Sequence, residues 1–152
     1  LERIRDQSGM LLTVDTMDNL LRSGRVSRFS AFLAGFLDLK PVLTMDREGK
    51  VVPVDRVRGR EALFQRAMAF VTQQVPKNVQ RLRFGVAHAD CLDVAERIRD
   101  ALLAQYQPLD VFVGPATSVL GTHVGIGAWA IFWQVEDGTP ELPGNKPAAA
   151  PL

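Results

Sequence analysis

Short apolar segments of strand character alternate with longer amphipathic segments of helical character along this chain. This alternation limits the possible folds more than any other feature of the sequence. The helical pattern is clearest in Glu61–Val75, which ends at Pro76, and in Cys91–Tyr106. The strand segments are Leu11–Val14, Pro41–Met45, Val51–Val54, Leu82–Ala87, Leu109–Val113 and Trp129–Val135. This order predicts an α/β (α+β) fold, in which a mixed β-sheet is covered by helices.

Turn and cap residues indicate where several of these segments begin and end. Gly49 lies at the tip of the DREGK turn, so the strand segments on either side of it are expected to form a hairpin. Asp15 or Thr16 can cap a short helix that runs to about Ser23. Asp90 can cap the helix that starts at Cys91, whose inward-facing residues are predicted to be Val94, Ile98 and Leu102.

The segment Arg28–Leu37 is predicted to be a short helix with a strongly apolar face. The apolar residues recur every three or four positions, at Phe29, Phe32, Leu33, Phe36 and Leu37, and the residues between them are mostly small. A face of this kind usually packs on the domain's own sheet. Small residues beside aromatic ones can also leave a slot for a long hydrocarbon tail, and the spacing alone leaves both interpretations open.

One of the two histidines, His123, lies among three glycines in the stretch Gly121–Ala130, GTHVGIGAWA. Glycine allows positive φ angles and lets a ligand approach the backbone closely. A histidine ring can donate a hydrogen bond to an anion at neutral pH. The stretch therefore predicts a glycine-rich turn that either binds an anion or has a structural role only.

Five short motifs follow one another between Ser23 and Gly127: SGRVS, KPVL, V-RGR, V-HAD and GTHVG-G. In this order they resemble the carboxy-terminal domain of the DegV family of bacterial fatty-acid-binding proteins, over residues 1–137. The resemblance implies a cytoplasmic, non-catalytic lipid carrier with a bound long-chain fatty acid and no other cofactor. It also implies an amino-terminal domain that is absent from this chain, as does Leu1–Asp6, which reads as a helix already in progress.

The resemblance assigns roles to individual residues. His123 would hold the fatty acid carboxylate, with Thr122 and the backbone of Gly121 as further donors. The acyl chain would lie in a pocket that contains Phe29, Phe32, Leu33 and Phe36. The docking arginines for the ATP-binding subunit of a fatty acid kinase would be Arg25, Arg58 and Arg60, although solvated or structural arginines are an equally weighted interpretation. Ile126 departs from the family, which usually has proline at that position.

An enzyme is the alternative interpretation. His88, Asp90 and His123 could serve a small hydrolase or phosphotransferase domain that acts on an anionic substrate. The sequence lacks GxSxG, HExxH and GxxxxGKS motifs. His88 and Asp90 have no third ligand close in sequence, so no metal site is predicted. The single cysteine, Cys91, excludes an internal disulfide and favours a reducing cytoplasm. Its thiol is either activated by the helix start or buried.

Charge and composition exclude other classes of protein. Residues 19–60 carry a net charge of +5 and the remainder −4, which predicts an anionic partner or simply a solvated face. Aromatic residues are not interleaved with the basic ones, which argues against nucleic-acid binding. No apolar run reaches the ~18 residues of a membrane span, so stable membrane insertion is not expected. Residues 138–152 contain four prolines and are predicted to be a flexible tail.

Overall fold

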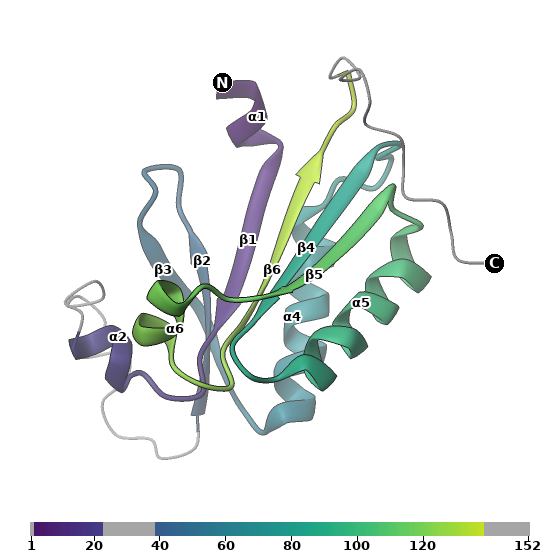
Figure 1. Ribbon diagram of the computed structural model, residues 1–152. Helices are drawn as coiled ribbons and strands as arrows, with labels where there is room; N and C mark the ends of the chain where they lie inside the picture. The colour runs from purple at the N-terminus through teal and green to yellow at the C-terminus, as the bar shows by residue number, and fades with distance from the viewer. Residues whose placement is uncertain (1, 23–38, 139–152) are drawn as a thin grey trace.

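The computed structural model describes residues 2–22 and 39–138, and in these ranges a six-stranded sheet carries helices on both faces (Figure 1). The strands are β1 (Ser8–Thr13), β2 (Leu39–Met45), β3 (Val51–Arg58), β4 (Leu82–His88), β5 (Asp110–Pro115) and β6 (Trp129–Val135). The helices are α1 (Glu2–Asp6), α2 (Asp18–Arg22), α4 (Arg60–Gln74), α5 (Leu92–Tyr106) and α6 (Ser118–Val124). The predicted fold class is confirmed.

The strands lie in the order β3-β2-β1-β6-β4-β5. β4 and β5 are parallel and are connected through α5, whereas the other neighbouring strands are antiparallel. Parallel strands need such a crossover, and antiparallel strands such as β2 and β3 can be joined by a short turn. Gly49 lies in that turn with φ 78°, as the hairpin prediction requires.

The main core lies between the sheet and the two long helices, α4 and α5, which cover the same face in Figure 1. Every second residue of β6 points into it, because side chains alternate along a strand. The buried core residues include Leu11, Val42, Leu63, Phe70, Val71, Phe84, Val86, Ile98, Leu102, Trp129, Ile131 and Trp133. Of the residues predicted to face inward from α5, Ile98 and Leu102 are fully buried, while Val94 is half-buried at the edge of this core.

A second, smaller core lies on the opposite face, where α2 and α6 cover one end of the sheet (Figure 1). Its buried residues are Leu12, Val14, Leu20, Leu43, Val124, Ala128 and Ala130. The two cores use alternate residues of the same strands, so the face each residue joins follows from strand register.

Five of the six strands are longer than their apolar patterns predict. β1 begins at Ser8 because its polar first residue still pairs with Gln134 of β6. β3 extends to Arg58 through backbone pairing with β2. The predicted helix at residues 28–37 and the predicted tail after residue 138 lie outside the described residues.

The prediction that Asp90 caps α5 is wrong. The capping position belongs to Cys91, and no side chain makes a capping bond there. Asp90 instead has a left-handed backbone with φ 57°. The Cys91 N–H donates to the Nδ1 atom of His88 over 3.4 Å. Asp90 thus lies one residue before the capping position, and its carboxylate makes no capping bond to the first turn of α5.

Candidate functional site

One end of the sheet gathers most of the residues that the sequence singles out. At this end β3 finishes at Arg58 and β4 at His88, while β6 begins at Trp129, which pairs with both His88 and Thr13 of β1. Helix α6, with His123 in its last turn, lies at the same end, and α4 and α5 both begin there (Figure 1). We call this the α6 end of the sheet.

The segment that begins with Gly121 is partly helical, so the expectation of a glycine-rich turn is wrong for Gly121–His123. Thr117 caps the start of α6, and its Oγ1 accepts a hydrogen bond from the Leu120 N–H at 3.3 Å. The turn starts at Gly125, where φ is 80°, and Gly127 has the same φ angle. Only these last two glycines therefore have conformations that glycine favours.

Of the groups in this segment that the sequence analysis named as anion donors, only the His123 ring is still available to bind an anion. The Thr122 hydroxyl has the carbonyl oxygens of Ser118 and Val119 as acceptors, at 3.1 and 2.7 Å. The N–H groups of Gly121, Gly125 and Gly127 donate to backbone carbonyls. The half-buried His123 ring makes no hydrogen bond to a residue that the structure describes, so its N–H can donate to a ligand.

His88, Asp90 and Cys91 form a turn with little sign of catalytic activation. The His88 ring accepts the Cys91 N–H, and the Cys91 Sγ donates to the Ala128 carbonyl at 3.4 Å. Burial raises the pKa of the Cys91 thiol, and the nearby carboxylates of Asp93 and Asp90 raise it further. A hydrogen bond from the Ala89 backbone and the charge of Arg60 lower this pKa, but the net shift is upward. Of the two interpretations, the half-buried thiol fits better than an activated one.

Arg58 and Arg60 are both exposed at the α6 end, on either side of Gly59. Gly59 has φ 87° and forms the junction between β3 and α4. This turn orients two guanidinium groups toward solvent at the end of the sheet where His123 lies. Arg25, the third predicted docking residue, lies outside the described residues, as do the predicted acyl-chain residues Phe29, Phe32, Leu33 and Phe36.

A feature that sequence reasoning missed is the side of β1, β6, β4 and β5 turned away from α4 and α5, which we call the open face. Strand register aligns one row of residues across it: Phe112, Gly85, Phe132 and Met10. The next row toward α6 is Gly114, Ala87, Ala130 and Leu12. In this row only Ala87 is not buried, and Ala130 and Leu12 belong to the second core beneath α2 and α6. Phe112 is 69% exposed and Phe132 38%. The sequence did contain a signal for this face: Phe132 alternates with the buried Ile131 and Trp133, so its side chain must point to the opposite side of the sheet.

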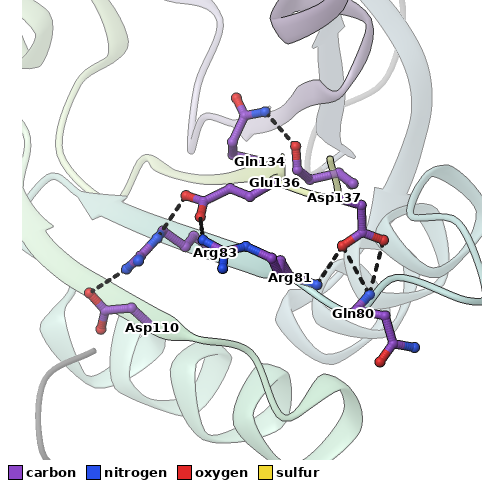
Figure 2. A network of polar contacts seen from close by, with 8 residues as sticks. Gln80, Arg81, Arg83, Asp110, Gln134, Glu136 and Asp137 are labelled. Atoms are coloured by element: carbon purple, nitrogen blue, oxygen red, sulfur yellow. Dashed lines mark hydrogen bonds and ion pairs between the residues drawn. The ribbon is translucent and has the colours of Figure 1, made fainter. Parts of the chain in front are cut away.

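A polar row bounds the open face at the end opposite α6. Arg83 lies between Asp110 on β5 and Glu136 after β6, as Figure 2 shows. Its Nε donates to Glu136 Oε1 at 2.7 Å, and its Nη1 is 3.8 Å from Asp110 Oδ2. Gln134 and Ser8 continue the row across β6 and β1. The open face is therefore apolar in the middle, with ion-paired residues at one end and the second core, which includes Val124 of α6, at the other.

Within residues 2–22 and 39–138, no group of three or more acidic, histidine or cysteine side chains is placed to hold a metal ion. In the same ranges, no helix has the length and apolar character needed to span a bilayer.

Comparison with known proteins places this domain in one family. Residues 1–136 match the family described as "Uncharacterised protein, DegV family". A DegV domain-containing protein of Streptococcus pyogenes serotype M3 is 37% identical over 119 residues, which is 78% of this chain and 40% of that protein.

Solved structures agree with this match. The chain is similar to a DegV family protein from Thermus thermophilus, described by its fatty acid binding, with 27% identity, a TM-score of 0.80, and coverage of 88% of this chain and 48% of that one. The Fatty Acid Kinase (Fak) B3 protein of Streptococcus pneumoniae, loaded with linoleic acid, shares the fold, with 15% identity, a TM-score of 0.76, and coverage of 88% and 47%. The chain thus spans somewhat less than half the length of these relatives.

Proposed function

This chain belongs to the DegV family, and on that premise we propose that it binds a long-chain fatty acid on the open face, with the carboxylate at His123. The observation that carries the proposal is the open face itself, which leaves two aromatic rings accessible on an otherwise well-packed sheet. Large exposed apolar patches on soluble domains usually mark binding surfaces.

The rows of the open face suit a narrow apolar guest. Gly85 and Ala87 follow one another on this side of β4, are only half-buried and have no side chain larger than a methyl group. Phe112 and Phe132 rise beyond them on either side of Gly85. A chain of 16 carbons that is buried there would gain about 10 kcal/mol, at roughly 0.8 kcal/mol per methylene, before ordering costs are subtracted.

His123 supports the carboxylate end of the proposal. A carboxylate that leaves water must receive hydrogen bonds, and the His123 ring is free of hydrogen bonds to described residues. Thr122 and the Gly121 backbone stay in the proposed site as close neighbours. Gly121 has open space where a Cβ would lie, which allows close approach of a head group.

Arg58 and Arg60 extend the proposal to a partner protein. Both are exposed at the α6 end, where the carboxylate would lie. Arginine presents a planar fork that suits carboxylates and phosphates. We therefore place the docking surface for an ATP-binding fatty acid kinase subunit around these residues. In this scheme the chain presents the substrate, and the partner performs the phosphoryl transfer.

The test is mass spectrometry of organic extracts from natively purified protein, both as the 152-residue chain and as the full-length gene product that carries it. We expect about one fatty acid per full-length molecule, and His123→Ala should reduce fatty acid affinity at least tenfold. His88→Asn is the matched control, because this second histidine lies at the same end but already bonds the Cys91 N–H. Absence of fatty acid from both preparations would refute the proposed function, and unchanged affinity in His123→Ala would refute the role of His123.

A further inference from the structure

A cavity of about 770 Å³ opens between β1 and the β2–β3 hairpin, at the end of the sheet away from α6. It exists because β1 pairs with β2 over Leu11–Thr13 only, so the two strands separate along Ser8–Met10 (Figure 1). Residues from both sides of the sheet line it, such as Trp133 from the side of α4 and Phe132 from the open face. The volume lies within the range of small-molecule sites, about 300–1,000 Å³.

The apolar wall of the cavity is built around Trp133. Its indole occupies the space that a side chain at position 9 would need. Because Gly9 has no side chain, the indole reaches the cavity and forms part of its lining. Met10, Met45 and Phe132 complete this wall. Aromatic rings pack well against other rings and against the thioether of methionine, so the wall suits a flat aromatic guest.

The lining also contains a buried acceptor, the side-chain oxygen of Gln7. The Gln7 Nε2 donates to the Asp137 carbonyl at 3.3 Å. This bond fixes the orientation of the side-chain amide, because a carbonyl oxygen can only accept. The Gln7 Oε1 is buried and accepts no hydrogen bond from a residue that the structure describes. Buried polar atoms normally have a partner, so the Gln7 side chain favours a guest that carries an N–H donor.

Charges of both signs lie at the rim of the cavity. On the β2–β3 hairpin, Arg47 is exposed and has no hydrogen bond or ion pair to a residue that the structure describes. Beside it, Asp46 Oδ1 accepts two backbone N–H groups of the turn at 2.9 and 2.8 Å, which leaves Oδ2 available. Arg5 and Asp6 form a second, looser pair at the rim, with 3.7 Å between Nε and Oδ1. Such a rim suits a guest that carries both a carboxylate and an ammonium group.

We propose that this cavity binds a free amino acid whose aromatic side chain carries an N–H donor, which is the chemistry of tryptophan. The ring lies against Trp133, and its N–H donates to Gln7 Oε1. The carboxylate pairs with Arg47 and the ammonium group with Asp46. These four residues lie outside both the open face and the α6 end, so the inference goes beyond the proposed function and does not depend on it.

The experiment is calorimetric titration of the full-length gene product with L-tryptophan and three analogues. Benzothienylalanine has sulfur in place of the indole N–H, indole-3-propionate lacks the ammonium group, and tryptamine lacks the carboxylate. L-tryptophan should bind about fivefold more tightly than each analogue, because each analogue loses one hydrogen-bonded contact. Absence of binding by L-tryptophan at about 10 mM, or an analogue that matches its affinity, would overturn the inference.

Two variants connect this selectivity to named residues. Gln7→Met removes the acceptor at similar side-chain length and should abolish the preference for L-tryptophan over benzothienylalanine, a change that a folding defect would not produce. Arg47→Ala should weaken L-tryptophan about tenfold, whereas tryptamine, which has no carboxylate, should not weaken. Lys50→Ala is the matched control, because Lys50 is a cation of the same turn that does not line the cavity.

Unchanged ligand preferences in both Gln7→Met and Arg47→Ala would overturn the inference. The fatty acid content of the same samples, measured by mass spectrometry, tests the proposed function separately. Protein that carries fatty acid but does not bind L-tryptophan would therefore refute this site alone.

Discussion

Replacing Gly9 with alanine should destabilise the fold, because the indole of Trp133 occupies the space that a Cβ would need. A Cβ at Gly9 would lie 2.1 Å from Trp133 Cζ2 and 2.3 Å from its Cε2, against the 3.5–4.0 Å of normal carbon contacts. Trp133 is only 7% exposed and packs against Phe70 with ring centroids 6.4 Å apart. The indole therefore has little room to move aside.

The expected cost of Gly9→Ala is about 3 kcal/mol, at the upper end of typical overpacking. For a chain of this length, that corresponds to a fall of roughly 6–12 °C in the melting temperature. Thermal unfolding followed by circular dichroism measures it. Gly85→Ala is the matched control, because its Cβ would lie 3.8 Å from atoms of Phe132, which is an ordinary contact. This control should change stability by less than about 0.5 kcal/mol.

A smaller indole should relieve the clash if the reasoning is correct. Trp133→Phe removes the atoms closest to the new Cβ, so Gly9→Ala should cost less in that background than in the wild type. The difference between the two costs is a coupling energy, which a double-mutant cycle measures directly. A Gly9→Ala variant as stable as Gly85→Ala, or a coupling energy of zero, would refute the argument.

Two further predictions concern the α6 end of the sheet. Partial burial raises the pKa of the Cys91 thiol, so at pH 8 the folded protein should react with iodoacetamide more slowly than the guanidine-unfolded chain, and faster as the pH rises. Equal rates at pH 8 would contradict a raised thiol pKa. Replacing both Arg58 and Arg60 with alanine should cut acyl phosphate formation by the kinase partner at least tenfold while the bound lipid remains, and loss of lipid together with activity would exclude a docking role.

Much of the secondary structure could be predicted from local pattern. Strand β6 has the predicted bounds, Trp129–Val135, and α5 differs from its prediction by one residue. Both have strong periodicity within a single segment, which is the information that a sequence window contains. The glycines with positive φ in the α6–β6 turn, Gly125 and Gly127, were likewise visible from residue type.

The candidate site was less accessible to sequence reasoning. His123 and the two arginines were identified by motif, but the hydrogen bonds that occupy Thr122 and the backbone N–H of Gly121 depend on the helical geometry of α6. Asp90 has the residue type of a cap, yet its backbone conformation removes it from that role. Residue identity thus predicts capacity for a hydrogen bond, and local geometry determines which partner receives it.

The sequence by itself determined the order of the six strands and the two long helices, the mixed α/β class and the family, because these depend on local periodicity and on short motifs. Only the tertiary structure decided that Gly85 lies between Phe112 and Phe132. It also decided that the ion-paired Arg83 lies at the end of the open face, and that β1 separates from β2 to leave a cavity. These neighbours come from strands that are distant in sequence. Their alignment follows from backbone pairing across the whole sheet, where a shift of one residue would turn every side chain to the opposite face.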